Sequence, residues 1–331
     1  MGEFELIRRH FVRGQSGPAV ALGIGDDCAL LRTTPGQQLA ISSDMLVEGR
    51  HFFPDVDPEA LGHKSLAVNL SDLAAMGARP LGFTLALALP GADDAWLRGF
   101  AAGLHALADA HGCPLVGGDT TRGPLNVCIT VFGEVTAGQA LRRDAARAGD
   151  DLWLSGRTGE ARLALERLRG TAWALAERSD ESLCRQRLER PTPRLALGTA
   201  LAGLAHAAID VSDGLAGDLG HILAASGVGA EIEQAALPVA PALRALPEAQ
   251  RLECLLHGGD DYELLFTAPT GAREAVARTA QASGTPAQRI GRITTGTGLR
   301  LIDPDGRAQA LHARGFDHFA PGAALGPAPV S

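Results

Sequence analysis

Residues 69–77 have the sequence NLSDLAAMG. This stretch places a single carboxylate, Asp72, in a helical segment that is otherwise small and apolar. Asn69 and Asp72 are three residues apart and therefore share one face of the helix. Another face carries leucines, namely Leu66, Leu70 and Leu73. We interpret the segment as a buried helix that presents Asp72 to a polar site. The alternative is an Asp that caps a helix or faces solvent.

Length and composition indicate a globular protein of two domains. A chain of 331 residues exceeds what one hydrophobic core usually organises. The composition changes in the charged segment 142–151, so we place the boundary there and expect domains at 1–145 and 146–331. The chain is 46% hydrophobic but only 4% aromatic, which suits helices packed closely against sheets.

Charge and cysteine content exclude several classes of partner. The formal net charge is −8 and no run of Lys or Arg occurs, which argues against nucleic acid and favours a small-molecule partner. No segment of membrane-spanning length is free of charge, and the N-terminus lacks the apolar core of a signal peptide. We therefore expect no membrane partner. The five cysteines are scattered and never spaced as CxxC, so we expect reduced thiols and a cytoplasmic location.

Hydrophobic periodicity predicts a mixed α/β fold, because strands and helices follow one another with turns of only a few residues. In the first half we expect a strand, turn and strand over 19–33, strands at 38–44, 80–89 and 125–136, a strand ending in glycines and an acid at 115–121, and helices at 58–76 and 93–111. In the second half we expect strands at 151–155, 207–210, 230–233, 264–267 and 289–293, a hairpin turning at 305–306, and helices at 159–169, 179–189, 193–204 and 272–283, with others ending near 226 and 256.

Acidic residues recur beside Gly, Ser or Thr, mostly where an apolar strand is expected to end. Five turns carry them, at Asp26 and Asp27, at Asp44, at Asp119, at Asp210 and Asp213, and at Asp260 and Asp261; Asp72 supplies a sixth point. One such turn has a structural explanation, because Asp and Gly are favoured in turns for local reasons. Six with the same pattern are hard to explain that way. In particular, we expect the segment 42–44 to lie at the mouth of a strand.

Carboxylates gathered in one cleft would raise each other's pKa unless cations were present. Oxygen-only ligands select hard cations, and Mg²⁺ combines a few carboxylates with waters and substrate phosphates. The turn at 210–214 is too short for an EF-hand loop, which disfavours a dedicated calcium site. Glycines beside the acids would allow backbone amides to approach phosphate oxygens. The pattern therefore favours nucleotide-dependent phosphoryl transfer assisted by several Mg²⁺ ions.

The familiar nucleotide-binding motifs are absent from the sequence. Lys64, the only lysine, has no glycine at the upstream spacing that a P-loop requires, so we expect a solvated or structural lysine. Protein-kinase and dinucleotide signatures are absent too. No Ser lies in a nucleophile elbow and no Cys lies beside a His. We therefore expect direct in-line transfer organised by metal ions, which needs no protein nucleophile.

Six motifs, in order along nearly the whole chain, resemble those of the bacterial thiamine-monophosphate kinase family. They are GIGDDCA at 23–29, ISSD at 41–44, NLSDLAAMG at 69–77, GGDTTRG at 117–123, IDVSDG at 209–214 and GGDDYEL at 258–264. The resemblance implies a two-domain fold like that of aminoimidazole ribonucleotide synthetase. Its N-terminal α/β domain would form a barrel-like core in a homodimer, and its C-terminal α/β domain would close the cleft. It also implies ATP as co-substrate and thiamine monophosphate as acceptor.

The resemblance also assigns roles to individual positions. Mg²⁺ would be held by Asp27, Ser42, Ser43, Asp44, Asp72, Asp119, Asp210 and Asp213. ATP would contact Gly118, Asp119, Arg143 and Ser212, and thiamine monophosphate would contact His51, Asp260 and Phe316. Asp260 stands where the family has a glutamate, so its reach is shorter by one methylene. A phosphate acceptor is already ionised, so we expect His51 to be a substrate contact rather than a base; the alternative is a surface histidine near a turn.

Two other functions are compatible with these residues. One is an ATP-dependent synthetase of the same superfamily that acts on a ribonucleotide or on selenide. Selenide is disfavoured because Cys28 follows the first acidic turn, and no nucleophilic Cys or Lys precedes it. The other is a catalytically silent regulator that binds Mg²⁺ or a nucleotide. Thiamine diphosphate formed from thiamine monophosphate and ATP would distinguish the kinase from both.

Overall fold

The computed structural model describes residues 3–13, 17–24, 28–176 and 179–315, which form two compact units. Unit 1 contains the described residues of 1–73 and 78–137, and unit 2 contains 74–77 and the described residues from 138 to 315. The predicted mixed α/β, two-domain organisation is confirmed. The domain ranges 1–145 and 146–331 stay a prediction. No helix in the described part of the chain is long and apolar enough to cross a membrane.

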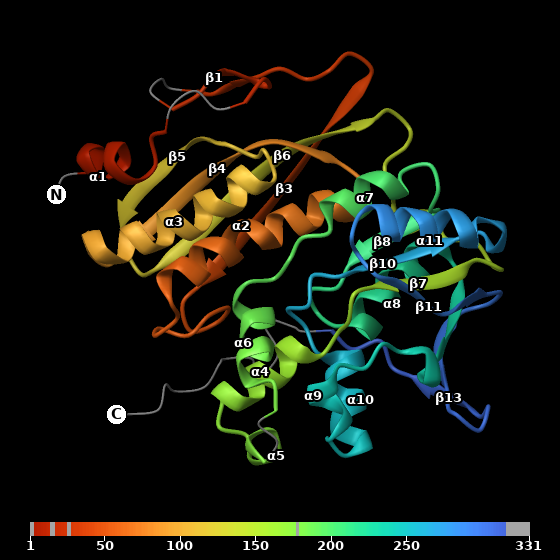
Figure 1. Cartoon of the computed structure of the whole chain (residues 1–331). Coiled ribbons are helices and arrows are strands. Elements are labelled where there is room, and N and C mark those ends of the chain that lie inside the picture. Colours follow the sequence, from red (N-terminus) through yellow and green to blue (C-terminus); the bar gives the residue numbers. More distant parts are fainter. Residues whose placement is uncertain (1–2, 14–16, 25–27, 177–178, 316–331) are drawn as a thin grey trace. The chain divides into compact units, whose positions relative to one another are not determined.

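Unit 1 is built on a four-stranded sheet with the strand order β3, β6, β4, β5 (Figure 1). The strands are β3 (Gln37–Val47), β4 (Arg79–Leu89), β5 (Leu115–Arg122) and β6 (Asn126–Thr136). β6 lies between β3 and β4 and runs antiparallel to both, whereas β5 runs parallel to β4. A separate pair, β1 (Val20–Leu22) and β2 (Leu30–Leu31), and the short helix α1 (Glu3–His10) precede this sheet in the chain.

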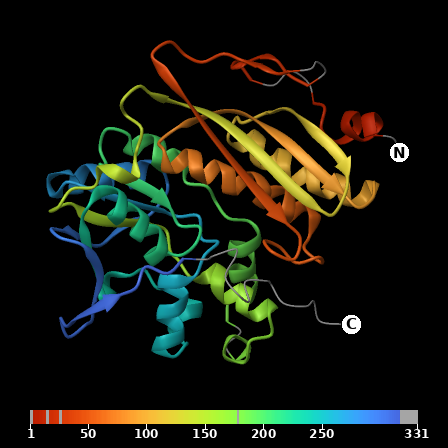
Figure 2. The ribbon, with the colours of Figure 1, turned by 180° about the vertical axis from the view of Figure 1, so that it is seen from behind.

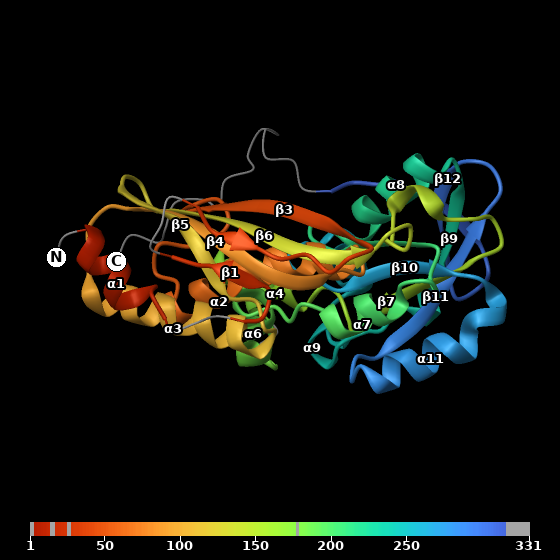
Figure 3. The ribbon, with the colours of Figure 1, turned by 90° about the horizontal axis from the view of Figure 1, so that it is seen from above.

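Two helices, α2 (Pro58–Ala75) and α3 (Asp94–Ala110), lie along one face of the unit 1 sheet (Figure 3). They approach so closely that a Cβ on Gly103 would lie 1.8 Å from the carbonyl oxygen of Glu59. Helix α2 is buried around most of its circumference, and Leu66 and Leu70 are fully buried. The buried helix predicted from the sequence is therefore confirmed. Lys64 on the same helix is only 4% exposed, so the solvated alternative for this lysine is wrong.

Two strands of unit 1 extend further than the sequence predicted. β3 continues past Asp44 and pairs with β6 as far as Val47. β5 continues through Asp119 and pairs with β4 as far as Arg122. The partner strands β4 and β6 are 11 residues long and supply the hydrogen bonds that extend their neighbours. The predictions of a strand mouth at 42–44 and of a turn at Asp119 are therefore wrong, because these residues lie inside strands.

Unit 2 is built on a seven-stranded sheet with the order β13, β12, β9, β11, β7, β10, β8. Its strands are among the yellow-green to blue arrows of Figure 2. The strands are β7 (Asp151–Ser155), β8 (Ala207–Asp210), β9 (Gly229–Glu233), β10 (Leu264–Ala268), β11 (Ala287–Thr294), β12 (Gly298–Ile302) and β13 (Ala308–Leu311). Neighbours are antiparallel except for the parallel pair of β9 and β12. The strands predicted at 151–155 and 207–210 are confirmed by β7 and β8.

Helices of unit 2 connect these strands and bury an aliphatic core against them. They are α4 (Glu160–Leu168), α5 (Ala172–Leu175), α6 (Glu181–Glu189), α7 (Leu195–Leu201), α8 (Leu215–Ser226), α9 (Pro241–Arg244), α10 (Glu248–His257) and α11 (Arg273–Ala282), with short 3₁₀ turns at η1 (Arg143–Ala145), η2 (Gln234–Ala236) and η3 (Thr270–Ala272). The core contains Leu154 and Leu265 from the sheet and Leu219 and Ile222 from α8, all fully buried. This core fixes α8 directly after the acidic end of β8.

A buried charge cluster surrounds Glu263, at the start of β10. The Glu263 carboxylate is fully buried and accepts hydrogen bonds from Arg187 Nη2 at 2.7 Å and from Arg194 Nε at 2.7 Å. Ser155 Oγ on β7 donates to it at 2.5 Å. Burial alone would raise the pKa of Glu263, but the hydrogen bond and charge of Arg194, together with Arg187, outweigh burial and hold the pKa below its ordinary value. The cluster links α6, the segment before α7 and β7 to the acidic segment 258–263.

We predict that Glu263→Gln lowers the free energy of unfolding by about 3–5 kcal/mol at pH 7, because two guanidinium groups lose their buried counter-charge. A carboxylate with a lowered folded pKa stabilises the fold above its unfolded pKa, near 4.5, and the stabilisation disappears as pH falls through the folded pKa. The difference between variant and wild type, measured by urea unfolding from pH 7 to pH 3, should therefore shrink below pH 4.5. Glu274→Gln, on the exposed side of α11, is the control and should leave the free energy of unfolding unchanged at each pH. A loss of stability in Glu263→Gln that does not vary with pH would contradict the charge argument.

Candidate functional site

Helix α2 and strand β3 form the first part of the candidate site, in unit 1. Ser42 Oγ donates a short hydrogen bond to Asp72 Oδ2, and the backbone N–H of Asp44 donates to Asn69 Oδ1 at 3.1 Å. Asn69 is itself held by a bond from its Nδ2 to the carbonyl oxygen of Ser65, at 3.0 Å. The predicted shared face of Asn69 and Asp72 is therefore the face that meets β3. Three oxygen-bearing side chains, those of Ser42, Asp44 and Asp72, come together on this side of the sheet.

Two other predicted metal ligands of unit 1 lie on the opposite face of the sheet. Successive residues of a strand point to opposite faces, so Ser43 is directed away from α2. Its Oγ lies 2.9 Å from Thr130 Oγ1 and donates to the carbonyl oxygen of Ile129 at 3.2 Å. Asp119 on β5 is the strand partner of Ala86 on β4, and Ala86 is the strand partner of Cys128 on β6. Cys128 and Thr130 lie on the same face, so the exposed side chain of Asp119 lies on that face too. The side chains of Ser43 and Asp119 are thus separated by the sheet from those of Ser42 and Asp72.

Gly118 has a structural reason to be glycine. Its φ is +148°, and a Cβ at this position would lie 1.9 Å from the carbonyl oxygen of Leu85 on β4. Only glycine permits this close approach of β5 to β4. The packing of β5 against β4 is therefore enough to explain why residue 118 is glycine. The contact of Gly118 with ATP stays a prediction.

His51 is part of the turn that ends β3. Its Nδ1 accepts the backbone N–H of Val47 at 2.9 Å, and its own backbone N–H donates to the carbonyl oxygen of Val47 at 3.0 Å. The neutral ring must therefore carry its proton on Nε2, which makes Nε2 a hydrogen-bond donor. A fixed donor suits contact with an anionic substrate better than it suits a general base.

The second part of the candidate site lies in unit 2, where β8 ends and α8 begins. Asp210, the last residue of β8, is 4% exposed, and Ser212 and Asp213 follow it in the turn. The backbone N–H groups of Ser212, Asp213 and Gly214 all donate to one oxygen, Oδ2 of Asp218, at 3.1 Å each. Asp218 belongs to the first turns of α8. The acidic turn is therefore fixed by a carboxylate that the sequence analysis did not identify.

The segment 258–263 is joined to this turn by backbone hydrogen bonds. Asp260 N–H donates to the carbonyl oxygen of Ser212 and Tyr262 N–H to that of Val211, both at 2.8 Å. Asp260 and Tyr262 have φ angles of +65° and +50°, which non-glycine residues rarely adopt. Such strain is retained where neighbouring contacts enforce it, and it is frequent at functional sites. Asp260, a predicted substrate contact, therefore lies beside the Ser212 turn.

Asp261 points away from this surface into the core of unit 2. Both of its carboxyl oxygens accept the backbone N–H of Gly159, at 3.0 Å, in the loop that leads into α4. Burial raises the pKa of Asp261 well above its ordinary value, although the Gly159 N–H and the charge of Arg187 act in the opposite direction. Burial also raises the pKa of Asp218 to about 7, and the neighbouring Asp213 contributes to this rise. Both buried acids therefore hold the loops in place by accepting backbone N–H groups.

Arg143 begins the short 3₁₀ turn η1 in unit 2, which packs against both α8 and β8. The carbonyl oxygen of Arg143 accepts a hydrogen bond from Oγ of Ser226 at 2.8 Å, at the C-terminal end of α8, whereas Ser212 precedes the N-terminal end of the same helix. Because η1 also packs against β8, which ends two residues before Ser212, the predicted contacts of Arg143 and Ser212 with ATP stay predictions. Asp27 and Phe316 lie outside the described residues.

Metal binding by the predicted residues stays a prediction. Within the described ranges, no three His, Cys, Asp or Glu side chains are grouped so that they alone could hold an ion. The predicted set also uses serine hydroxyls, Asp27 and residues of both units. The donor chemistry of Ser42, Asp44 and Asp72, which offers only oxygen, nevertheless fits a hard cation such as Mg²⁺. Sequence reasoning missed Asp218, although an acid in the apolar run Leu215–Leu219 was a usable signal.

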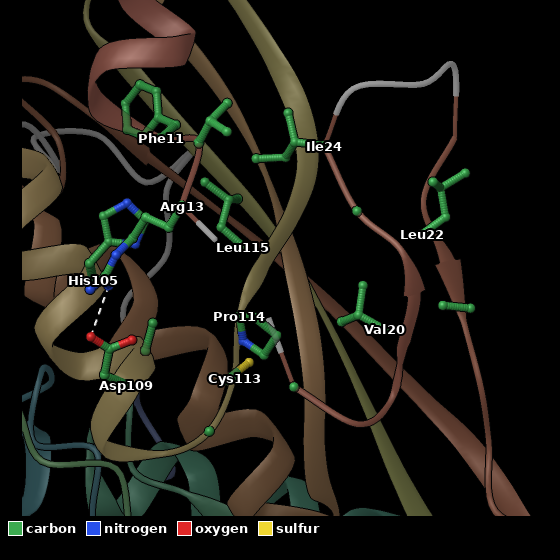
Figure 4. Close-up of a pocket in the computed structure, with 16 residues that line it drawn as sticks. Phe11, Arg13, Val20, Leu22, Ile24, His105, Asp109, Cys113, Pro114 and Leu115 are labelled. Carbon is green, nitrogen blue, oxygen red and sulfur yellow. Dashed lines mark hydrogen bonds and ion pairs between the residues drawn. The ribbon is translucent and has the colours of Figure 1, made fainter. Parts of the chain in front are cut away.

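A pocket of about 700 Å³ in unit 1 lies apart from these residues (Figure 4). Apolar side chains, among them Phe11, Ile24 and Leu115, line it together with Arg13 and Asp109, which form an ion pair of 2.8 Å. None of the residues predicted to bind metal, ATP or the acceptor is among those that line it. We therefore do not assign the predicted site to this pocket.

Comparison with known proteins matches both halves of the chain to one family. Residues 25–135 match the model of the AIR synthase related protein N-terminal domain, and residues 147–304 match that of its C-terminal domain. Thiamine-monophosphate kinase of Salmonella typhimurium is 46% identical over 322 residues, which cover 96% of this chain and 98% of the relative. The crystal structure of thiamine-monophosphate kinase from Stenotrophomonas maltophilia K279a is similar with a TM-score of 0.81 and 49% identity, over 88% of this chain and 93% of that one.

A further solved structure, AaThiL complexed with AMPPCP and TMP, is 30% identical with a TM-score of 0.74, over 87% of this chain and 89% of that one. The matched ranges of the family models contain Ser42, Asp72 and Asp119 in the first half and Asp210, Asp213 and Asp260 in the second. The similarity extends over nearly the full length of the relatives. The chain belongs to the thiamine-monophosphate kinase family of the AIR synthase related proteins.

Proposed function

We infer that the protein is an ATP-dependent kinase that phosphorylates thiamine monophosphate to thiamine diphosphate. The observation that carries this inference is the full-length similarity to thiamine-monophosphate kinases, at 46% and 49% identity. A structural relative complexed with AMPPCP and TMP supports ATP as the phosphoryl donor and thiamine monophosphate as the acceptor. The acidic and glycine motifs of the sequence agree with this chemistry, since phosphoryl transfer depends on positioning and charge neutralisation.

We propose that the chain's own residues act by binding and orienting the two substrates. Asp72, aligned by Ser42, and Asp44 would hold Mg²⁺ in unit 1 together with Asp27, and Asp210 and Asp213 would do so in unit 2. When bound, Mg²⁺ would screen the negative charge of the phosphates as they approach each other. The terminal phosphate of the acceptor is already ionised, so the protein needs no general base for this step.

The remaining assignments extend the proposal to the two substrates. ATP would contact Ser212, Arg143, Gly118 and Asp119. Ser43 would take part in metal binding on the face of the sheet that it shares with Asp119, opposite Ser42 and Asp72. His51, through its Nε2 donor, and Asp260, beside the Ser212 turn, would contact thiamine monophosphate together with Phe316. Because the side chain of Asp260 is one methylene shorter than the family glutamate, the acceptor would have to approach the Ser212 turn more closely to make this contact. A reducing, cytoplasmic location suits the five free cysteines.

The reaction itself is tested by incubating the purified protein with Mg²⁺, ATP and one acceptor at a time. We expect thiamine diphosphate and ADP in equal amounts with thiamine monophosphate, and no ADP with unphosphorylated thiamine, a ribonucleotide or selenide. ADP formation only with a ribonucleotide would favour the synthetase alternative. ATP binding without turnover with any acceptor would favour a regulator.

Asp72→Asn tests the metal role of the α2 site. The substitution removes one charge but little volume, and Asn Oδ1 can still accept the hydrogen bond from Ser42, so we expect the melting temperature to stay near that of wild type. We expect turnover to fall about 100-fold or more, the range seen when one preorganised electrostatic group is removed. Asp109→Asn, which removes an exposed acid paired with Arg13, is the control. Near-normal turnover of Asp72→Asn would contradict a metal role.

We further propose that the chain forms a homodimer through the face of the unit 1 sheet that α2 and α3 leave uncovered, so that two sheets form a barrel-like core. The exposure of alternate apolar residues of β3 supports this proposal. Leu39, Ile41 and Met45 are 47%, 59% and 54% exposed and lie on one face of the strand. A row of exposed apolar side chains on a sheet face is typical of an interface.

Ile41→Glu tests the proposed dimer. A charge in the centre of the apolar row would be buried without a partner on association, so we expect the variant to sediment as a monomer where wild type sediments as a dimer. Leu183→Glu on α6, where Leu183 is 38% exposed, is the matched control and should remain dimeric. A monomeric wild type, or an Ile41→Glu variant that stays dimeric, would contradict this interface.

A further inference from the structure

Asp218 occupies an unusual position at the start of α8. It is the fourth residue of the helix, is 3% exposed, and gathers three consecutive backbone N–H groups on a single oxygen. Those N–H groups belong to the turn of Ser212, Asp213 and Gly214. Three successive N–H groups directed at one point make a concave site for an anion. In this chain the anion is the protein's own carboxylate.

This arrangement determines how the turn can meet a nucleotide. The N-terminal end of a helix and the turn before it are common places for phosphate, because unpaired N–H groups point outward there. Here those N–H groups are used by Asp218, so a phosphate oxygen cannot accept them without displacing a buried side chain. The turn's own polar side chains are the carboxylates of Asp210 and Asp213 and the hydroxyl of Ser212, and we expect a ligand to meet these groups. The turn is thus arranged to present acids and a hydroxyl, rather than amides.

The bonds to Asp218 also fix the direction of those acids. A turn with three unpaired N–H groups would rotate its peptides toward water, since buried donors without a partner are costly. A change in the backbone dihedral angles of Ser212 and Asp213 would redirect both side chains. The adjoining loop has a separate anchor: Asp261 accepts the N–H of Gly159, so Asp260 does not depend on Asp218 alone.

We propose that Asp218 is a positioning residue that preorganises the turn 210–214 to bind Mg²⁺-ATP through its side chains. It acts through the backbone N–H groups of Ser212, Asp213 and Gly214 and does not itself touch the nucleotide. The proposal rests on the proposed function, because it takes Mg²⁺-ATP as the ligand of this turn. The simpler possibility, that Asp218 only stabilises the start of α8, predicts lower stability with no selective effect on nucleotide binding.

The test compares wild type with Asp218→Asn and Asp218→Gly, and with Asp150→Asn as a matched control. Asp150 is a buried acid of unit 2 that also accepts a backbone N–H, from Arg147 at 2.9 Å, but lies outside the turn. Binding of Mg²⁺-AMPPCP is measured by calorimetry, and the KM values for ATP and for thiamine monophosphate are measured separately. Melting temperatures report folding, and Asp218→Asn keeps an acceptor oxygen should Asp218→Gly fail to fold.

We expect Asp218→Gly to bind Mg²⁺-AMPPCP at least about tenfold more weakly, the factor that corresponds to one lost hydrogen bond of ordinary strength. Asp218→Asn keeps an acceptor oxygen but loses the charge that strengthens these hydrogen bonds, so we expect a smaller loss, of about threefold or more. The KM for thiamine monophosphate should change less than about twofold, because Asp260 keeps its own anchor. Added sodium formate should restore much of the affinity of Asp218→Gly, since a small carboxylate can enter the space that the side chain leaves. Formate should not affect wild type or Asp150→Asn.

The proposal is overturned if the Asp218 variants bind Mg²⁺-AMPPCP like wild type, or if both substrates are affected equally and formate restores nothing. Either result would assign Asp218 a structural role. Failure of the proposed function gives a different pattern: wild type would bind Mg²⁺-AMPPCP but form no thiamine diphosphate, and the comparison of affinities would still decide the role of Asp218. A wild type that does not bind Mg²⁺-AMPPCP would overturn both proposals.

Discussion

The contact between α2 and β3 is the interaction on which the unit 1 site depends. Asn69 and Asp72 meet the strand three residues apart on one helical face, and each makes a hydrogen bond to it, with Asp44 and Ser42 respectively. The contact is possible because α2 is small and apolar elsewhere and packs tightly against α3 and the sheet. A carboxylate placed in such surroundings is costly unless it is paired or binds a cation. The fold therefore gives Asp72 a defined direction before any ligand arrives.

In unit 2, buried acids hold the backbone of the loops that carry the candidate site residues. Asp218 fixes the turn that carries Asp213, and Asp261 fixes the neighbouring loop that carries Asp260. The backbone hydrogen bonds between the two loops join them into one element, and the Glu263 cluster attaches it to the sheet. Acids that we propose to bind the ligand, Asp213 and Asp260, lie close in sequence to acids that hold the backbone, Asp218 and Asp261. Neighbouring acids of one motif, such as Asp260 and Asp261, can therefore have different roles although the sequence does not distinguish them.

Much of the fold could be predicted from the sequence because it rests on local patterns. Periodicity located β7 and β8 to the residue, and the three-residue spacing of Asn69 and Asp72 predicted their shared face. Motif spacing predicted the family, which the comparisons confirmed. Local patterns did not reveal where β3 and β5 end, because their length depends on hydrogen bonds from partner strands distant in sequence.

Two features of the site could not be derived from single motifs. Ser42 and Ser43 look equivalent in the sequence, yet the pleat of β3 directs them to opposite faces of the sheet. The role of Asp218 depends on the folded turn before α8, in which three backbone N–H groups point at its carboxylate. The sequence does not specify this geometry. Asp72, at which the sequence analysis began, accepts a hydrogen bond from Ser42, the serine that shares its side of the sheet.

We propose that ATP's γ-phosphoryl group passes directly to thiamine monophosphate, with both substrates held in place and no protein nucleophile. The stereochemical course of the reaction tests this most directly. With ATP made chiral at the γ-phosphorus by oxygen isotopes, a single direct displacement predicts thiamine diphosphate with inverted configuration at its terminal phosphorus. Retention of configuration would reveal a phosphorylated enzyme intermediate and would contradict the account.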